Sequence, residues 1–169
     1  MPDPRETTST PKTPEPREPA SRLGRWRRRW RSRRVIVRDH SMEPTFRPGD
    51  RLLVDPGAYR TDPVARDDLV VIEDPARAER RLLKRVVGIA GDFVRVSREG
   101  IERVARPTGE GSPPPDGALE ELEVPAGHVF VLSDRRQNTR DSRQFGSLPV
   151  SMVVGRVWRR IPAAGSGRP

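Results

Sequence analysis

Short runs of apolar residues, separated by clusters of Pro and Gly, make up most of this chain from about residue 35 onward. Runs of this length that are rich in Val, Ile and Leu are typical of β-strands. The pattern predicts no long helix and no internal repeat. It predicts a hairpin formed by 93–96 and 101–104, and further strands over 51–54, 68–72, 82–89, 128–132 and 152–158. The expected fold class is all-β, built from curled antiparallel sheets.

Three segments lack this pattern. Residues 1–21 hold six prolines and almost no apolar side chains, which predicts a disordered tail. The tail has no apolar run of the about seven residues that a secretory signal peptide needs. Residues 106–119 include three consecutive prolines and predict a flexible excursion, and 162–169 predict a second disordered tail. The folded domain is therefore expected over 35–161.

Between the first tail and the domain, residues 22–34 contain eight arginines and no acidic residue. In a helix, Leu23, Trp26 and Trp30 would form a narrow apolar stripe in a cationic surround. Tryptophan and arginine in this arrangement suit the headgroup zone of an anionic membrane, which is the contact we expect. Nucleic-acid phosphate would attract the same charges, and a disordered basic linker would have the same composition.

Composition narrows the remaining chemistry. Hydrophobic residues make up 33% and charged residues 34% of the chain, so part of it is expected to lie outside a single modest core. The chain has no cysteine and two scattered histidines, which argues against a zinc site, and we expect neither metal nor cofactor. No run of twelve apolar residues occurs, whereas a transmembrane helix needs about 20, so none is expected in this chain.

The segment from Asp39 to Phe46 offers a candidate nucleophile, Ser41. Pro44 and Pro48 fix φ and remove backbone donors, so the segment is expected to form a turn. Serine is a poor nucleophile unless a neighbouring base takes its proton. His40 adjoins Ser41, but adjacent side chains of an extended segment point to opposite faces, and His128 has no evident charged partner. Both histidines are expected to be structural.

Lysine is the more informative candidate for the base. Of 33 basic residues all but two are arginine, and the two lysines are Lys12 in the tail and Lys84 in the predicted strand 82–89. Alternation along that strand places Lys84 on one face with Leu82 and Val86. Burial can lower the pKa of a lysine by up to about 3–5 units, whereas arginine stays charged. Lys84 is therefore either the base for Ser41 or a lysine whose amine extends to solvent.

Four blocks in this order resemble the Ser–Lys signal peptidase I family, and the resemblance runs from about Val35 to Ile161. They are Ser41-Met42-Glu43-Pro44-Thr45, Lys84-Arg85-Val86-Val87-Gly88 with Gly91-Asp92, Gly127 to Gly146, and Val153-Val154-Gly155-Arg156-Val157. The resemblance implies an all-β serine endopeptidase that cleaves signal or leader peptides after small residues, usually Ala at P1 and P3, through an acyl-enzyme. Its partners would be precursor proteins.

The resemblance also implies roles for residues of the third block. Thr139 would orient the Lys84 amine through its hydroxyl. Asp141 and Arg143 would form a supporting ion pair near the site. Asp134 and Ser142 would support these residues without contacting the substrate.

The chain departs from the family pattern at three positions near the proposed site. Asp39 stands where some members have a serine that donates to the oxyanion, and Ser133 and Arg135 replace the expected Gly and Asn. An ionised Asp39 would repel an oxyanion, so we expect its side chain to point away, or activity to be impaired. Members usually carry a spanning helix before the serine block, where this chain has only Val35-Ile36-Val37. Peripheral attachment to the cell membrane is expected, with a cytoplasmic location as the alternative.

Three other functions fit parts of the sequence. One is a soluble maturation protease of the same family that acts on a single precursor, and another is a non-catalytic Arg-rich module that binds membrane or nucleic acid. The third is a self-cleaving Ser–Lys repressor domain, which needs an Ala-Gly or Cys-Gly bond before the serine. The chain's Ala-Gly bonds all follow Ser41, at 90–91, 126–127 and 164–165.

Overall fold

Antiparallel strands account for most of the described structure. The computed structural model describes residues 32–60, 62–97, 101–104, 118–135 and 137–161. Its strands are β1 (Arg33–Ile36), β2 (Arg51–Asp55), β3 (Leu69–Asp74), β4 (Arg77–Ile89), β5 (Phe93–Ser97), β6 (Ile101–Val104), β7 (Ala118–Glu123), β8 (His128–Leu132), β9 (Leu148–Pro149) and β10 (Val153–Ile161). Its helical segments are short: α2 (Ser142–Phe145) and two 3-10 turns, η1 (Ala58–Arg60) and η2 (Val150–Met152).

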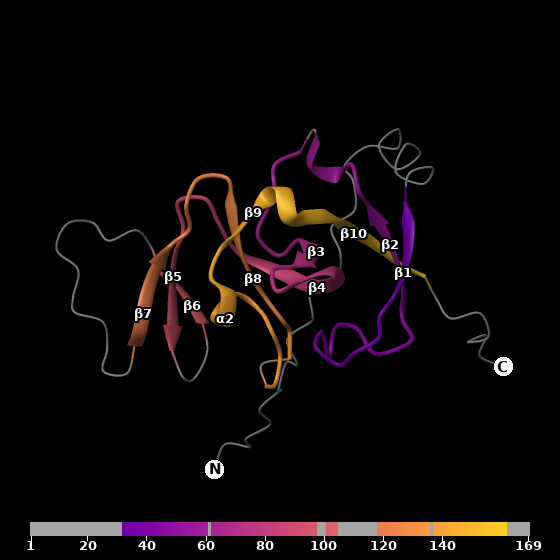
Figure 1. Cartoon of the computed structure of the whole chain (residues 1–169), viewed down its shortest axis with the longest axis horizontal. Helices are drawn as coiled ribbons and strands as arrows, with labels where there is room; N and C mark the ends of the chain where they lie inside the picture. The colour runs from indigo at the N-terminus through magenta and orange to yellow at the C-terminus, as the bar shows by residue number, and fades with distance from the viewer. Residues whose placement is uncertain (1–31, 61, 98–100, 105–117, 136, 162–169) are drawn as a thin grey trace, which may run out of the picture.

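The strands form two sheets. A seven-stranded sheet has the order β1-β2-β10-β3-β4-β8-β9, and a three-stranded sheet has the order β6-β5-β7. In Figure 1 the small sheet lies at one end of the molecule and β1 and β2 lie at the other. The expected all-β fold of antiparallel sheets is confirmed.

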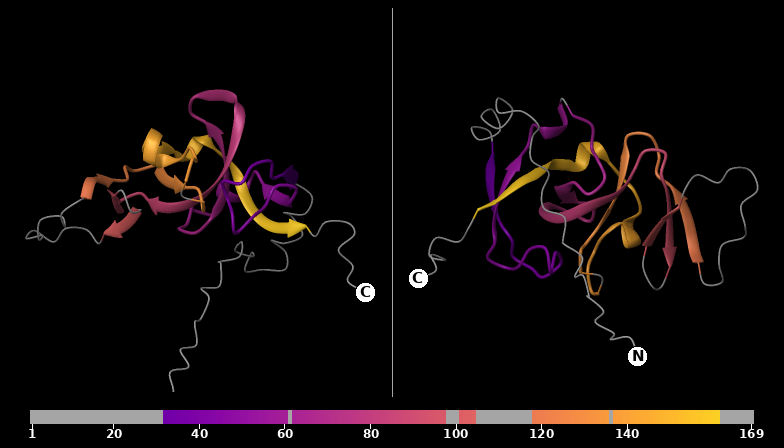
Figure 2. Two further views of the ribbon diagram at one scale, coloured as in Figure 1. Left: turned by 90° about the horizontal axis from the view of Figure 1, so that it is seen from below. Right: turned by 180° about the vertical axis from the view of Figure 1, so that it is seen from behind.

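The long strand β4 lies inside the large sheet. It pairs with β3 on one side and with β8 on the other. The β3–β4 hairpin extends beyond the body of the sheet, and Figure 2 shows it projecting when the molecule is seen from below. Its residues Glu73 and Arg77–Arg81 are exposed. This hairpin starts β4 five residues before the expected strand 82–89, because backbone pairing with β3 continues where the side chains turn polar.

Most expected strands occur close to their predicted bounds. The strand at 128–132 and the hairpin of β5 with β6 are confirmed. The expected excursion over 106–119 is wrong at its last two residues, because Ala118 and Leu119 belong to β7. This strand has the sequence Ala-Leu-Glu-Glu-Leu-Glu, which contains no β-branched residue, so its intrinsic β-propensity is low. Backbone pairing with β5 stabilises it as a strand.

Several expectations fall on the ends of the chain. The tail over 1–21, the tail over 162–169 and the proposed membrane contacts Leu23, Trp26 and Trp30 lie outside the described residues. At the domain boundary, β1 begins at Arg33, two residues before the expected start. Among the helices that the structure describes, none has the length and apolar character needed to cross a membrane.

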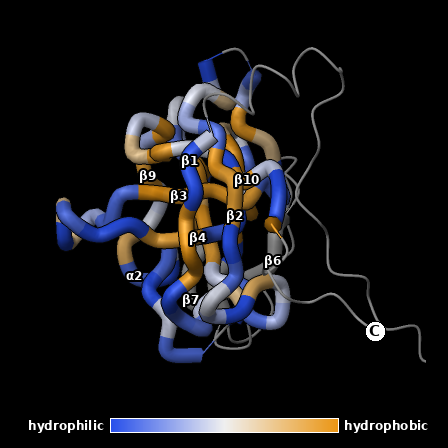
Figure 3. The backbone as a smooth tube through the Cα atoms, turned by 90° about the vertical axis from the view of Figure 1, so that its right-hand side faces the viewer, coloured by the Kyte–Doolittle hydropathy of each residue, from blue (hydrophilic) through white to orange (hydrophobic). Residues whose placement is uncertain are grey.

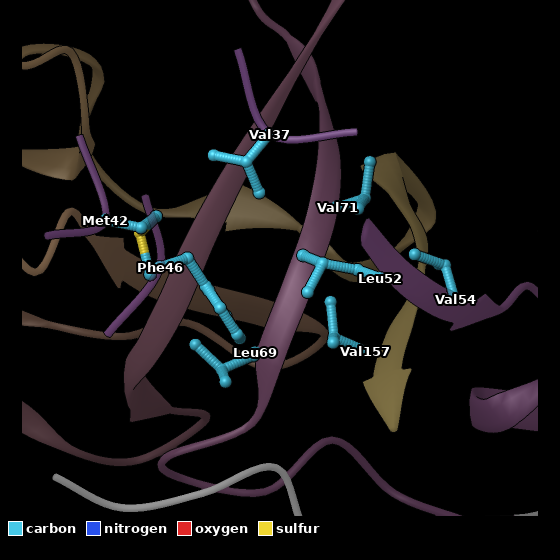
Figure 4. Packing of buried hydrophobic residues seen from close by; sticks show 8 residues of the cluster. All are labelled: Val37, Met42, Phe46, Leu52, Val54, Leu69, Val71 and Val157. Atoms are coloured by element: carbon cyan, nitrogen blue, oxygen red, sulfur yellow. The ribbon is translucent and has the colours of Figure 1, made fainter. Parts of the chain in front are cut away.

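Buried side chains of the large sheet hold the turn that carries Ser41. Figure 3 shows hydrophobic residues concentrated along the central strands β3 and β4. One cluster of the core includes two residues of the turn, Met42 and Phe46, both almost fully buried. In Figure 4 they lie beside Leu69 of β3, with Val37, Leu52, Val54, Val71 and Val157 completing the cluster. Burial of Met42 therefore fixes the backbone next to Ser41.

We expect Met42→Ala to lower the free energy of unfolding by about 2–5 kcal/mol, because it removes a fully buried side chain and leaves a cavity. The matched control is Ile36→Ala, since Ile36 is 57% exposed and its truncation is expected to change stability by less than about 0.5 kcal/mol. Urea unfolding followed by tryptophan fluorescence measures both. Equal losses in the two variants would contradict this account of the turn.

Candidate active site

Ser41 lies in the turn after β1, and backbone hydrogen bonds hold this turn. The N–H of Phe46 donates to the carbonyl of Met42 at 2.8 Å, and the N–H of Arg135 donates to the carbonyl of Ser41 at 2.9 Å. The second bond attaches the serine to the loop after β8. Ser41 itself is partly exposed, whereas Met42 points into the core. The turn expected from its prolines is confirmed, and it presents the Ser41 hydroxyl at the surface of the domain.

His40 does not face Ser41 as a base would. Its Nδ1 lies 2.8 Å from Oε1 of Glu43, and 62% of its side chain is exposed. His128 lies at the start of β8, where its Nδ1 is 3.0 Å from the carbonyl oxygen of Ala126. Both histidines thus have local partners, as their expected structural role requires.

Lys84 is buried in the middle of β4, where only 2% of the residue is exposed. It is paired with Val70 of β3, and Leu82 and Val86 on its own face are also buried. The apolar surroundings expected from strand alternation are thus present. The amine donates a hydrogen bond to the carbonyl oxygen of Leu83 at 3.0 Å.

This environment favours the neutral form of Lys84. Burial is the strongest influence and lowers the pKa of the amine. The negative charges of Asp39, Asp141 and Asp134 oppose this effect, and the positive charge of Arg80 adds to it. The net result is a pKa below the ordinary lysine value, which is the direction that a general base requires.

Ser41 and Lys84 line the same cleft, although 43 positions separate them in the sequence. The cleft has a volume of about 400 Å³, and its other lining residues are Asp39, His40, Arg80, Leu82, Arg135, Gln137, Asn138, Thr139 and Arg140. A second cavity of about 970 Å³ is lined by Val35–Asp39 on one side and by the β3–β4 hairpin on the other. The two cavities share Asp39, Arg80 and Leu82, so this groove leads into the cleft.

A network around Asp134 joins the serine turn to the lysine strand. Arg85, next to Lys84, donates to both carboxylate oxygens of Asp134 at 2.8 Å. The hydroxyl of Thr45, four residues after Ser41, donates to Asp134 and accepts from Arg85 at 3.3 Å. Bidentate Arg–carboxylate pairs fix relative position as well as charge. Asp134 therefore links the serine turn to β4 through Thr45 and Arg85.

The expected ion pair between Asp141 and Arg143 is present. Arg143 donates to both carboxylate oxygens of Asp141 at 2.8 Å. Asp141 also caps helix α2, and its carboxylate accepts the N–H of Ser133 at 3.1 Å. Burial opposes the charge of Asp141, but the Arg143 side chain and the Ser133 N–H hold the pKa of this carboxyl below its ordinary value.

Thr139 and Ser142 take different positions. Thr139 lines the cleft, but its hydroxyl donates to the carbonyl of Arg135 at 3.1 Å and accepts from Arg143 at 3.0 Å. Among the described contacts of the Lys84 amine, the Thr139 hydroxyl does not appear, contrary to the expected orienting bond. The Ser142 hydroxyl is buried and accepts the N–H of Val131 in β8 at 2.9 Å. Ser142 therefore joins helix α2 to β8 by a hydrogen bond.

Of the two alternatives for Asp39, the structure excludes the first, because the side chain does not point away from the Ser41 N–H. Its Oδ1 accepts the backbone N–H of Ser41 at 3.0 Å. Burial raises the pKa of Asp39, but hydrogen bonds from the Ser41 side chain and backbone, with the charges of Lys84 and Arg80, bring it below the ordinary value. The carboxylate is therefore ionised near neutral pH and lies against the serine.

Sequence reasoning did not find the arginines at the cleft. Asp74, whose side chain is fully buried at the end of β3, lies 3.6 Å from Arg140 and 4.0 Å from Arg80. In a chain with so many arginines, composition gives no signal for these two. The β3–β4 hairpin places Arg80 at the cleft, and the loop after β8 places Arg140 there. Across the described residues, no His, Asp and Glu side chains gather in a group that could hold a metal ion.

The chain resembles known proteins in family, sequence and structure. The sequence model of the family described as "Signal peptidase, peptidase S26" matches residues 30–161. The mitochondrial ATP-independent inner membrane protease subunit 1b of Arabidopsis thaliana is 36% identical over 124 residues, which cover 72% of this chain and 66% of that protein. The chain thus spans just under two thirds of this relative.

Bacterial relatives match over similar lengths. The probable signal peptidase I-1 of Synechocystis sp. is 33% identical, with 76% of this chain and 70% of that protein covered. Signal peptidase I of Bacillus caldolyticus is 32% identical, with 72% and 75% covered. A crystal structure of a signal peptidase I from Enterococcus faecalis has 21% identity and a TM-score of 0.41, covering 56% of this chain and 97% of that one.

Because Lys84 and Lys12 are the chain's two lysines, NMR of protein labelled in lysine can titrate each side chain directly. We expect the Lys84 amine to lose its proton at a lower pH than Lys12, because burial disfavours its charged form. Lys12 serves as the reference within the same spectrum. Coincident titration of the two amines would contradict the environment described for Lys84.

Proposed function

The chain belongs to the signal peptidase family, peptidase S26, a family of hydrolases that act on peptide bonds, and we propose that it is a serine endopeptidase that removes leader peptides from precursor proteins. Ser41 is the nucleophile and Lys84 the general base. The observation that carries this assignment is the shared cleft, which is lined both by the partly exposed Ser41 and by the buried Lys84 of lowered pKa. The signal peptidase relatives support the substrate class.

The reaction is amide hydrolysis through an acyl-enzyme. The neutral amine of Lys84 accepts the proton of the Ser41 hydroxyl as Oγ attacks the scissile carbonyl carbon. When the tetrahedral intermediate breaks its C–N bond, the lysine ammonium gives this proton to the leaving amine. Water then attacks the ester, Lys84 takes a proton from the water, and Ser41 Oγ recovers it as the leader leaves with a new carboxylate.

The supporting residues hold these groups in place. Asp134 and Arg85 connect the serine turn to β4, so they act on the relative position of Ser41 and Lys84. Asp141, Arg143 and Thr139 form one hydrogen-bonded group, in which Thr139 lines the cleft. We assign all of these as positioning residues.

The substrate would enter as an extended strand. The groove lies between Val35–Asp39, which continues from the edge strand β1, and the β3–β4 hairpin, so a substrate there would lie beside a strand edge, as in strand addition. It leads to the cleft at Leu82, an apolar side chain next to Lys84 on the same face of β4. Cleavage after small residues in an Ala-x-Ala pattern, as the family resemblance implies, is part of the proposal.

We expect Ser41→Ala and Lys84→Ala to lower kcat on an Ala-x-Ala precursor by at least about a thousandfold, because nucleophile and base act as one unit. Lys84→Arg is the sharper variant, since arginine keeps the charge and length but cannot act as a neutral base. Ser151→Ala, at an exposed serine of η2, is the matched control and should retain wild-type activity. Wild-type cleavage by Lys84→Arg would exclude the Ser–Lys mechanism.

The pH dependence follows from the direction of the Lys84 shift. The amine must be neutral to accept the serine proton, so kcat/KM should rise with pH through the lowered pKa of Lys84 and level off above it.

We also propose that residues 22–34 bind an anionic membrane surface, where the precursors are met. The support is the sequence alone: eight arginines, no acid, and Leu23, Trp26 and Trp30 at helical spacing. Nucleic acid is the competing partner, because phosphate would attract the same arginines.

We expect the protein to float with vesicles containing phosphatidylserine and not with neutral vesicles. Trp26→Ser combined with Trp30→Ser keeps every arginine and should reduce flotation, because the apolar stripe is lost while the charge stays. The control is the unchanged chain with neutral lipid. A substitution of Trp158 would not serve as a control, because this side chain is part of the core. Equal flotation of the double variant and the wild type would show that binding depends on the arginine charges and not on the two tryptophans.

A further inference from the structure

Asp39 occupies the backbone donor that catalysis by Ser41 requires. In acyl transfer, the N–H of the nucleophilic residue commonly donates to the oxygen that becomes negative in the transition state. Here the Ser41 N–H already donates to Oδ1 of Asp39 at 3.0 Å. A carboxylate oxygen thus lies where a scissile carbonyl oxygen would have to bind.

The same carboxylate acts on the base. Burial lowers the pKa of Lys84, and among the charges that oppose this fall Asp39 has the largest influence, ahead of Asp141 and Asp134. An ionised Asp39 therefore favours the protonated amine, which cannot accept the serine proton. Both effects reduce reactivity in the site without substrate.

The position of Asp39 connects this contact with substrate entry. It is one of three residues that line both the groove and the cleft, together with Arg80 and Leu82. An extended chain that follows the groove toward Ser41 passes Asp39 where the groove joins the cleft. Arg80 lies on the same path, and its ion pair with Asp74 is long at 4.0 Å, so its guanidinium is available to a second carboxylate.

We propose that Asp39 is a resident blocking group of this active site, which a substrate must displace from the Ser41 N–H toward Arg80 before the carbonyl can be attacked. The inference rests on the proposed Ser41–Lys84 function. It predicts a low rate on short peptides, because only a substrate that fills the groove supplies binding energy for the displacement. The other charged groups that face the cleft are Arg135, Arg140 and His40, and none of them hydrogen-bonds to Asp39 in the described structure.

The test compares Asp39→Asn and Asp39→Ser with the wild type on one short Ala-x-Ala peptide and one full-length precursor. Loss of a charged hydrogen-bond acceptor should raise kcat on the short peptide about tenfold, with a smaller gain on the precursor. The acid limb of the kcat/KM profile should move to lower pH, because Lys84 loses its nearest favourable charge. Glu123→Gln, which removes an exposed charge on β7, controls for net charge and should behave as the wild type.

A substrate-free measurement separates this inference from the proposed function. The lysine NMR titration of Asp39→Asn should show Lys84 losing its proton at a lower pH than in the wild type, with Lys12 unchanged. Rates at or below the wild type in both Asp39 variants would overturn the inference, while loss of cleavage in Ser41→Ala and Lys84→Ala would still stand. If no form of the protein cleaves either substrate, the proposed function fails. The NMR titration then tests the inference by itself, and an unchanged pKa of Lys84 in Asp39→Asn would overturn it.

Discussion

The bidentate ion pair between Arg85 and Asp134 is the interaction on which the site depends, because it joins segments that the sequence separates. Arg85 belongs to β4, Asp134 to the loop after β8, and both contact Thr45 of the serine turn. A nearly buried ion pair tolerates desolvation only when its geometry is good and its remaining donors are used, and here both conditions are met. Ser41 and Lys84 thereby face one cleft from two different parts of the fold.

Within this frame, the charge state of Lys84 results from two opposing influences. The apolar face of β4 removes the amine from water, whereas nearby carboxylates favour its charged form. Asp141 is already neutralised by Arg143, and Asp134 by Arg85, so these two act on the lysine from within closed ion pairs. Among the described residues, no arginine hydrogen-bonds to Asp39, which contacts the serine itself. The site therefore balances a structural requirement for carboxylates against a chemical requirement for a neutral amine.

Much of the fold could be predicted from local pattern. Apolar runs with β-branched residues marked β2, β3, β8 and β10 because such residues bury one face of a sheet. The hydrophobic pattern did not predict the strand segments that are held by backbone pairing with a neighbouring strand and not by burial of their side chains. The polar start of β4 is held by β3, and β7 is held by β5. Helix α2 was also missed, although its capping box, from Asp141 to Gln144, is readable in the sequence.

The sequence by itself determined the two reactive candidates, since Ser41 stands on a proline-bounded turn and Lys84 is the lone lysine among arginines on an apolar strand. The family resemblance of the sequence implied the ion pair of Asp141 with Arg143, which the structure contains. Only the tertiary structure decided which groups meet these residues. The meeting of Ser41 with Lys84 at one cleft, and the arginines around it, depend on how the turn, the hairpin and the loop after β8 converge. Such convergence is fixed by long-range packing, and no local pattern encodes it.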